Sequence, residues 1–277
     1  MEKEILITKM INIKNKVRIN KPLIHCITNH ITINDCANVV LSAYGKPIMA
    51  EHYKEVSEIT ASSNALAVNI GNITDNRMES IMISGKIAYE KKIPSIIDVV
   101  GVSCSSLRLN FAMDFIGKCK PSVIKGNMSE IKAIFGLDTK SKGIDVNDED
   151  ITTEDNISNN IYVVKNLSRK INSVVVATGA IDIISNGDET YIIENGCMEL
   201  SKITGTGCML NVLIATYMSS NDILNSAILG TVTMGICGEL SSKISKGTAS
   251  FKIGLLDNIS IITDNDIVER MKIVKVM

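Results

Sequence analysis

Short apolar runs alternate with longer amphipathic segments along most of the chain. The runs are rich in β-branched residues and apolar on both faces, which is typical of strands in a parallel sheet covered on both sides. They comprise residues 23–28, 65–70, 95–100, 122–125 and 173–178. Between them we expect helices at 33–44, 74–92, 110–119, 128–136 and 156–171. This alternation predicts an α/β fold.

The pattern changes in the last third of the chain. Two short runs, 181–185 and 191–194, flank Asn186-Gly187, and we expect a hairpin or meander at the sheet edge. Further helices are expected at 206–219, 222–244, 248–257 and 264–271. Thr32-x-x-Asp35 and Thr152-x-x-Asp155 have the spacing of helix capping boxes. The polar stretch at 138–160 is interpreted as a solvated loop before a helix, so one domain over residues 1–277 is expected.

Composition excludes several classes of protein. The 277 residues carry 29 basic and 30 acidic side chains, which gives no basic footprint for nucleic acid. No uninterrupted apolar stretch of about 18 residues occurs, so we expect neither a transmembrane helix nor a membrane partner. The charged start is unlike a secretory signal. The seven cysteines are odd in number and lack a C-x-x-C pair, which argues against disulfides or structural zinc and favours a cytoplasmic location.

Polar and glycine residues follow all five apolar runs. They are Asn29, Gly71-Asn72, Asp98, Gly126-Asn127 and Thr178-Gly179. In open α/β sheets, ligands bind outside the carboxyl ends of the strands. The active site is therefore predicted at this rim of the sheet.

The strongest local motif is a glycine turn at 204–210, Thr-Gly-Thr-Gly-Cys-Met-Leu. Two glycines allow the backbone to approach a ligand, and the free N–H groups of a following helix attract an anion. A tight turn that only caps a helix is an equally good interpretation. The motif is not G-x-G-x-x-G, and a phosphate-binding loop of the G-x-x-x-x-G-K-[ST] type does not occur.

Three further features have more than one interpretation. Asn127-x-x-Glu130 is either a helix cap or a source of a carboxylate that, with Asp98, holds magnesium through water. Cys208 is a core residue, a base or a nucleophile; its place at a helix start predicts a pKa below ~8.5. His25 is expected to be a strand residue with satisfied hydrogen bonds.

Taken together, several segments resemble the hydroxyethylthiazole kinase family of the ribokinase-like superfamily. The matching segments are residues 23–29, 34–35, 47–50, 67–71, 121–131, 204–210, 246–247 and 250–251. The likeness extends from about residue 23 to 257, in the family's order. Its most specific element is Cys208 in the glycine turn, where most ribokinase-like enzymes have an aspartate. Two positions depart from the family pattern: Val99 replaces a proline and Lys125 replaces an arginine.

The resemblance implies a three-layer ribokinase-like fold with a mostly parallel sheet and helices on both faces. It implies transfer of the γ-phosphoryl group of ATP to the alcohol of 4-methyl-5-(2-hydroxyethyl)thiazole, with Mg²⁺, in thiamine salvage. It also implies a homotrimer with active sites at subunit interfaces. The implied catalytic residues are Gly205, Thr206, Gly207 and Cys208. The implied thiazole-binding residues are Asn29, Met49, Thr204 and Gly205, the ATP-binding residues Lys125, Asn127 and Thr178, and the metal-binding residues Asp98 and Glu130.

Two other classes of function stay open. A related NAD(P)H-hydrate dehydratase would share the N-x-x-E and glycine-turn motifs but would have an aspartate at position 208. A non-catalytic thiazole-binding or thiamine-binding protein would have little reason to keep Asp98, Glu130 and the glycine turn together. A sugar kinase is disfavoured because the chain has no di-glycine.

Overall fold

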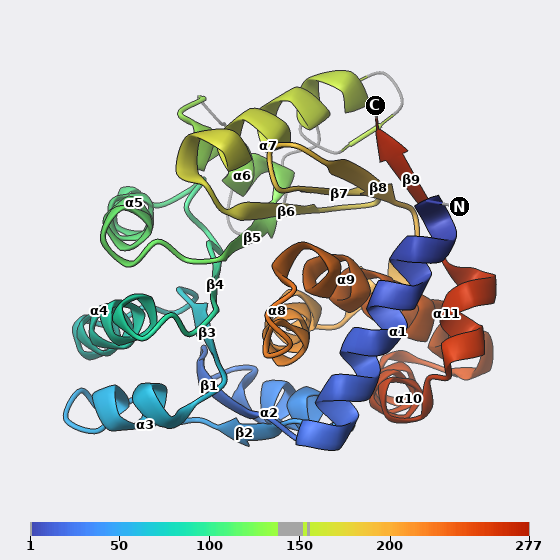
Figure 1. The fold of residues 1–277 in the computed structure, drawn as a ribbon, viewed down its shortest axis with the longest axis horizontal. Coiled ribbons are helices and arrows are strands. Elements are labelled where there is room, and N and C mark those ends of the chain that lie inside the picture. The colour runs from blue at the N-terminus through green and yellow to red at the C-terminus, as the bar shows by residue number, and fades with distance from the viewer. Residues whose placement is uncertain (1, 138–151, 154–155, 277) are drawn as a thin grey trace.

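The computed structural model describes residues 2–137, 152–153 and 156–276 of the chain. In these residues one sheet has the strand order β2-β1-β3-β4-β5-β6-β7-β8-β9 (Figure 1). The strands are β1 (Leu23–Ile27), β2 (Lys46–Ile48), β3 (Ala65–Asn69), β4 (Ser95–Asp98), β5 (Val123–Asn127), β6 (Val174–Thr178), β7 (Asp182–Ser185), β8 (Thr190–Ile193) and β9 (Ile273–Val276). Strands β2 to β6 are parallel to their neighbours, whereas β6 to β9 pair in antiparallel fashion.

Helices cover both faces of the sheet (Figure 1). Those on one face are α1 (Glu2–Asn20), α2 (Ile33–Ser42), α8 (Thr206–Met218), α9 (Ile223–Ile244), α10 (Thr248–Ile261) and α11 (Asp264–Arg270). Those on the other are α3 (Val56–Ser62), α4 (Asp75–Glu90), α5 (Ser106–Cys119), α6 (Met128–Phe135) and α7 (Ile157–Ile171). A short 3₁₀ helix, η2 (Met198–Lys202), precedes α8.

Alternation along the strands divides the apolar side chains between two cores. In β3, Ala65 and Ala67 join the core under α8 and α9, whereas Leu66 and Val68 join the core under α4 and α5. Neighbouring side chains of a strand point to opposite faces, so continuous apolar runs satisfy both layers. This confirms the predicted α/β fold with helices on both faces of a mostly parallel sheet.

The five apolar runs all form strands, and the amphipathic segments between them form helices. The predicted hairpin forms as β7 and β8, with Gly187 in the left-handed region at φ +93°. It does not lie at the sheet edge as predicted, because β9 pairs with β8 and forms that edge. The elements that were not predicted are α1, β2, α3, η2 and β9.

The sequence of helix α1 contains a pattern that indicates a helix. Leu6, Met10, Ile13 and Val17 are buried along it, and their spacing of three and four residues is that of one helical face. Its charged residues lie between these positions. Strand β2 has only three residues, one of them a proline, and gives no comparable signal.

The predicted capping box at Thr32 and Asp35 is wrong. Helix α2 begins at Ile33, but Thr32 makes no side-chain capping bond. Its hydroxyl donates to the side-chain oxygen of Asn29 instead, and Asp35 pairs with Lys252 at 2.7 Å. Asp155 of the second proposed box, and most of the polar stretch at 138–160, lie outside the described residues.

Helix α9 is, in the described residues, long and apolar enough by composition to cross a membrane. Its most apolar 18-residue window is 83% buried inside the protein. It packs against α1, α8, α10 and α11, which is the environment of a core helix.

Close packing between α8 and α9 depends on Gly230. A methyl group there would lie 2.6 Å from Cγ1 and 3.2 Å from Cα of Ile214. We expect Gly230→Ala to lower the free energy of unfolding by about 1–3 kcal/mol, because the helices must move apart. Gly117→Ala in α5 is the matched control, since nothing lies within 4 Å of that position. Urea unfolding that finds both variants equally stable would contradict this account.

Candidate active site

Three polar side chains form a row across the carboxyl ends of adjacent parallel strands. Asn69 of β3 is in register with Asp98 of β4, and Asp98 is in register with Lys125 of β5. Two residues earlier, the same strands carry Ala67, Ile96 and Val123, which belong to the core under α8. Because side chains two residues apart share a face, the polar row lies on the α8 side of the sheet. The register of the three strands therefore brings these polar side chains together at the rim where the site is predicted.

A buried ion pair lies at the centre of this row. The Nζ of Lys125 lies 3.1 Å from Oδ2 of Asp98, and the two residues are 3% and 2% exposed. The same carboxylate oxygen accepts a 2.9 Å hydrogen bond from Nδ2 of Asn69. Burial raises the pKa of Asp98, although Lys125 and Asn69 oppose this effect. Burial lowers the pKa of Lys125, but the charge and hydrogen bond of Asp98, together with smaller effects of Cys208 and Glu130, outweigh burial and raise that pKa.

Cys208 lies at the start of α8 next to two amide groups. Its Sγ accepts hydrogen bonds from Nδ2 of Asn29 at 3.1 Å and from Nδ2 of Asn69 at 3.3 Å. Asn69 thus contacts both the thiol and Asp98, which joins the glycine turn to the polar row. Asn69 was not predicted as a site residue, because it lies inside the predicted strand 65–70, whereas the observed strand ends at Asn69.

The prediction that the pKa of Cys208 is lowered is wrong. Burial raises the pKa, and the negative charge of Asp98 raises it further, whereas Thr32, Lys125 and Asn29 only partly oppose them. The side chain is therefore a neutral thiol at neutral pH in the free protein. A helix N-terminus favours thiolate where solvent or cations assist it, but here a buried carboxylate lies nearby.

Glu130 is a helix cap in the structure. Its Oε2 accepts from the backbone N–H of Asn127 at 2.7 Å, and Asn127 Oδ1 accepts from the N–H of Glu130. Its Oε1 accepts from the N–H of Gly101 at 2.7 Å, which ties the loop after β4 to α6. Burial, with a smaller effect from Asp98, raises the pKa of Glu130 to about 7. The cap is confirmed, while the magnesium role stays a prediction.

The glycine turn presents free backbone N–H groups to the rim. The first intrahelical bond of α8 runs from Met209 N to Gly205 O, so the N–H groups of Thr206, Gly207 and Cys208 have no partner within the helix. Gly205 has φ +94°, and a methyl group there would lie 2.4 Å from Cγ2 of Thr32. The hydroxyl of Thr206 donates to Leu200 O at 2.9 Å and anchors the turn to η2.

Thr32 is a second residue that the sequence analysis misjudged. Its hydroxyl and its backbone N–H both donate to Oδ1 of Asn29, at 3.1 and 3.2 Å. Because this fixes the carbonyl side of the amide, Nδ2 of Asn29 must face Cys208. Thr32 therefore orients the Asn29 amide. Its methyl group also lies so close to position 205 that only glycine fits there.

The remaining predicted residues lie at different distances from this cluster. Asn127 and Thr178 are paired in register at the ends of β5 and β6, and Thr178 donates to Gly126 O. Met49 follows β2, beside β1, and packs partly buried against the α8-side core. Thr204 is exposed just before the turn. His25 is a buried strand residue whose two ring nitrogens contact Thr60 Oγ1 and Ala50 O, as expected.

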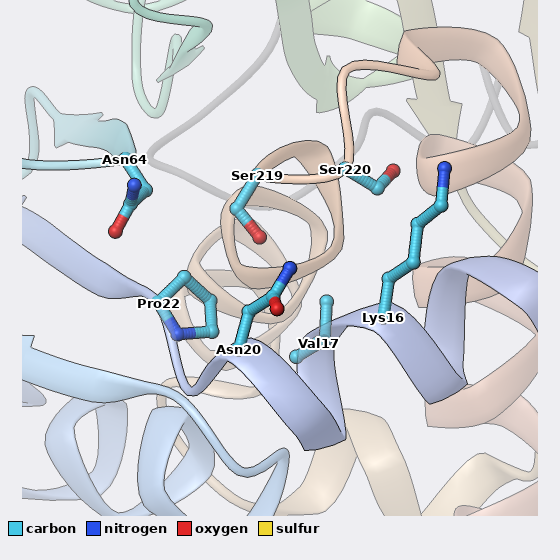
Figure 2. Close-up of a pocket in the computed structure, with 7 residues that line it drawn as sticks. All are labelled: Lys16, Val17, Asn20, Pro22, Asn64, Ser219 and Ser220. Carbon is cyan, nitrogen blue, oxygen red and sulfur yellow. The ribbon is translucent and has the colours of Figure 1, made fainter.

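Two cavities of the protein lie away from this cluster. One, of about 180 Å³, is at the amino end of β1 and β3 and the far end of α8 (Figure 2). The other, of about 430 Å³, lies between α1, Tyr44 and the end of α10. Since neither reaches the carboxyl ends of the strands, neither encloses a ligand at the predicted rim.

This sheet topology, with a glycine turn opening a helix above the strand ends, is that of the ribokinase-like kinases. A solved ribokinase-like superfamily protein from Enterococcus faecalis superposes with a TM-score of 0.61 at 12% identity, with 86% of each chain covered, and shows the shared fold. The chain belongs to the hydroxyethylthiazole kinase family, whose model matches residues 14–265.

Individual relatives agree with this assignment. The chain is 60% identical over 261 residues to hydroxyethylthiazole kinase 2 of Clostridium botulinum strain Langeland, covering 94% of this chain and 98% of the relative. The solved hydroxyethylthiazole kinase protein of Pyrococcus horikoshii OT3 superposes with a TM-score of 0.88 at 29% identity. That superposition covers 98% of this chain and 100% of the other.

Proposed function

We propose that the chain transfers the γ-phosphoryl group of ATP to the primary alcohol of hydroxyethylthiazole. The observation that carries this proposal is the placement of Cys208 at the free N-terminus of α8, within hydrogen-bond reach of Asn29 and Asn69 and beside the Asp98–Lys125 pair. An alcohol held next to the thiol would face the helix N–H groups, where a transferring phosphoryl group is stabilised. A dehydratase would have an aspartate at position 208.

An ATP-consumption assay tests this function directly. Hydroxyethylthiazole, pyrimidine alcohols and sugars are compared side by side, and consumption with hydroxyethylthiazole alone is expected. Consumption with another alcohol would change the substrate class. Binding of the thiazole without consumption of ATP would favour a binding protein.

The site residues would have three roles: binding the thiazole, contacting the ATP phosphates and stabilising the charge that develops during transfer. Asn29, Met49, Thr204 and Gly205 would line the thiazole pocket. Lys125 and Asn127 at the end of β5, and Thr178 at the end of β6, would contact the ATP phosphates. The N–H groups of Gly205, Thr206, Gly207 and Cys208 would stabilise the developing charge. In a loose transition state the alcohol keeps its proton until late, so a neutral thiol is an adequate neighbour.

The rim fits a magnesium ion held jointly with nucleotide. Among the described residues no group of three or more His, Cys, Asp or Glu side chains forms a complete metal cage. Mg²⁺ is commonly bound by one or two carboxylates together with phosphates and water, and Asp98 and Glu130 supply such a pair. When bound, the ion would neutralise charge on the phosphates.

Glu130→Gln tests the metal role against the cap role. We expect turnover to fall about 100-fold and the Mg²⁺ requirement to rise, while thiazole affinity stays unchanged. Asp266→Asn is the matched control, because Asp266 closes the same kind of capping box on α11. The control should lose stability alone. Unchanged turnover of Glu130→Gln at saturating Mg²⁺ would show that Glu130 is only a cap.

Cys208→Ser should keep measurable phosphoryl transfer, because positioning and backbone N–H groups supply most of the catalysis. Cys208→Asp should also stay active, since Asn29 and Asn69 can donate to a carboxylate. Alkylation of Cys208 should abolish activity, and hydroxyethylthiazole should protect. Because Cys104 is exposed and Cys208 is only 8% exposed, the labelling is done in a Cys104→Ser background. A wholly inactive Cys208→Ser that still binds both substrates would make the thiol an obligatory base or nucleophile.

We also propose a homotrimer with active sites at subunit interfaces. Ile31, two residues after Asn29, is 63% exposed beside the site, and an apolar side chain there suits contact with a second copy. Light scattering should give roughly 90 kDa, three times the chain mass of 30.1 kDa. Ile31→Asp should lower both the mass and the activity, whereas Ile19→Asp on the distant α1 should lower neither. A fully active monomer would remove the shared-site proposal.

A further inference from the structure

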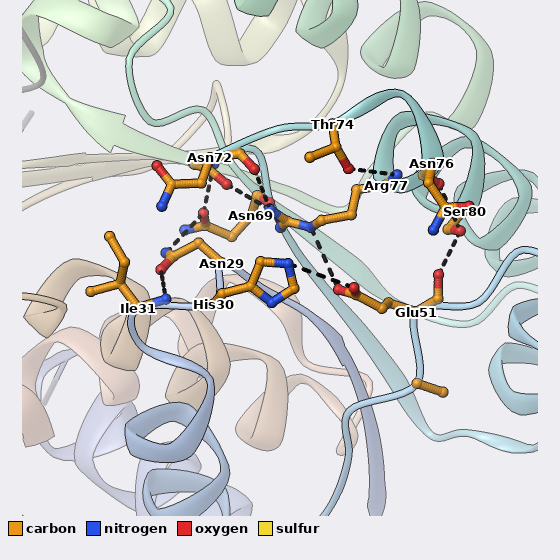
Figure 3. Close-up of polar contacts among 12 residues, drawn as sticks. Asn29, His30, Ile31, Glu51, Asn69, Asn72, Thr74, Asn76, Arg77 and Ser80 are labelled. Carbon is orange, nitrogen blue, oxygen red and sulfur yellow. Dashed lines mark hydrogen bonds and ion pairs between the residues drawn. The ribbon is translucent and has the colours of Figure 1, made fainter.

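Arg77 is a buried arginine that binds backbone rather than solvent. It lies in the first turn of α4, is 1% exposed, and donates from Nη1 to Gly71 O at 2.8 Å and to Asn72 O at 2.9 Å (Figure 3). Its Nη2 donates to Asn69 O at 3.0 Å. One guanidinium thus holds three carbonyl groups of the turn that follows β3. The planar fork of arginine can span such a turn, whereas the single nitrogen of lysine cannot.

The turn held by Arg77 sets the orientation of the Asn69 side chain. Oδ1 of Asn69 accepts from the N–H of Gly71 at 2.8 Å, so Nδ2 must point the other way, toward Asp98 and Cys208. The turn also places Asn72 in the left-handed region at φ +48°. This conformation is uncommon for a residue other than glycine and persists where surrounding bonds hold it.

Glu51 extends the same network to the loop after β1. Its Oε2 lies 3.7 Å from Nε of Arg77, a buried atom without a hydrogen-bond partner in the described residues. Its Oε1 lies 3.7 Å from Nε2 of His30, the residue after Asn29 (Figure 3). Ser80 of α4 donates to Glu51 O at 2.7 Å. Glu51 therefore contacts both segments that carry the amide donors to Cys208.

We propose that Arg77 is a positioning residue of the kinase site, which fixes the turn after β3 so that the Asn69 amide lies between Cys208 and Asp98. Glu51 neutralises the buried guanidinium and links this turn to the Asn29 loop. The proposal rests on the proposed role of the Cys208 region in binding the alcohol. Arg77 itself contacts no reacting group.

The test compares Arg77→Lys, Asn69→Ala and the double variant. We expect Arg77→Lys to lower kcat/KM for hydroxyethylthiazole by about 10-fold to 100-fold, because the amide shifts, while KM for ATP is unchanged. In the Asn69→Ala background, Arg77→Lys should cause no further loss. Arg169→Lys is the matched control, since Arg169 also donates to a backbone carbonyl, Gly187 O, but in the distant β7–β8 hairpin. The control should keep wild-type kinetics.

A second readout does not depend on turnover. The alkylation rate of Cys208, measured by mass spectrometry in the Cys104→Ser background, should change by a similar factor in Arg77→Lys and Asn69→Ala. If the wild-type chain does not phosphorylate hydroxyethylthiazole, the proposed function fails, and this labelling still decides the role of Arg77. If Arg77→Lys does not fold, Glu51→Gln takes its place in the same cycle with a smaller expected loss.

Two results would overturn the proposal. A lower melting temperature with unchanged kcat, KM and labelling rate would make Arg77 a purely structural residue. Losses that multiply in the double variant would show that Arg77 does not act through Asn69.

Discussion

The ion pair between Lys125 and Asp98 constrains the whole rim of this sheet. Both charges are buried, and an unpaired buried charge is strongly destabilising, so each residue requires the other. Because they lie in register on β4 and β5, the pair forms only if the two strands align as they do. The alignment of β4 and β5 therefore determines where the two charges lie, and with them the position of the candidate site.

Helix α8 completes the site because its body and its first turn have different roles. Its body is apolar and packs over β3 and β4, while its first turn extends past the ends of those strands. The N–H groups of the first turn, which have no partner within the helix, are thereby brought to the end of the sheet where Cys208 contacts Asn69. A shift of two residues that placed Ala67, Ile96 or Val123 beneath the helix start would carry the polar side chain of that strand beyond the helix start and break the row.

Much of this could be predicted from the sequence because the signals are local. Apolar runs identified the strands, the residues after them identified the rim, and the glycine turn identified the start of α8. The features that escaped depend on contacts between distant segments. Asp35 has the spacing of a capping partner for Thr32, yet its carboxylate pairs with Lys252 of α10, far along the chain. The pKa of Cys208 depends on Asp98, 110 residues earlier in the chain, whose proximity no local pattern reveals.

Charge balance supports the proposal that a cation binds at this rim together with the nucleotide. The buried cluster contains one cationic side chain, Lys125, and two carboxyl groups, Asp98 and Glu130, of which Asp98 already neutralises the lysine. A triphosphate brought to the same place adds several negative charges, and the partial positive charge at the start of α8 offsets only about half of one. Burial raises the pKa of Glu130 to about 7, and the negative charge of Asp98 makes a smaller contribution to this rise. A divalent cation entering with the phosphates would offset their charge together with that of Asp98, the same carboxylate that contributes to the raised pKa of Glu130.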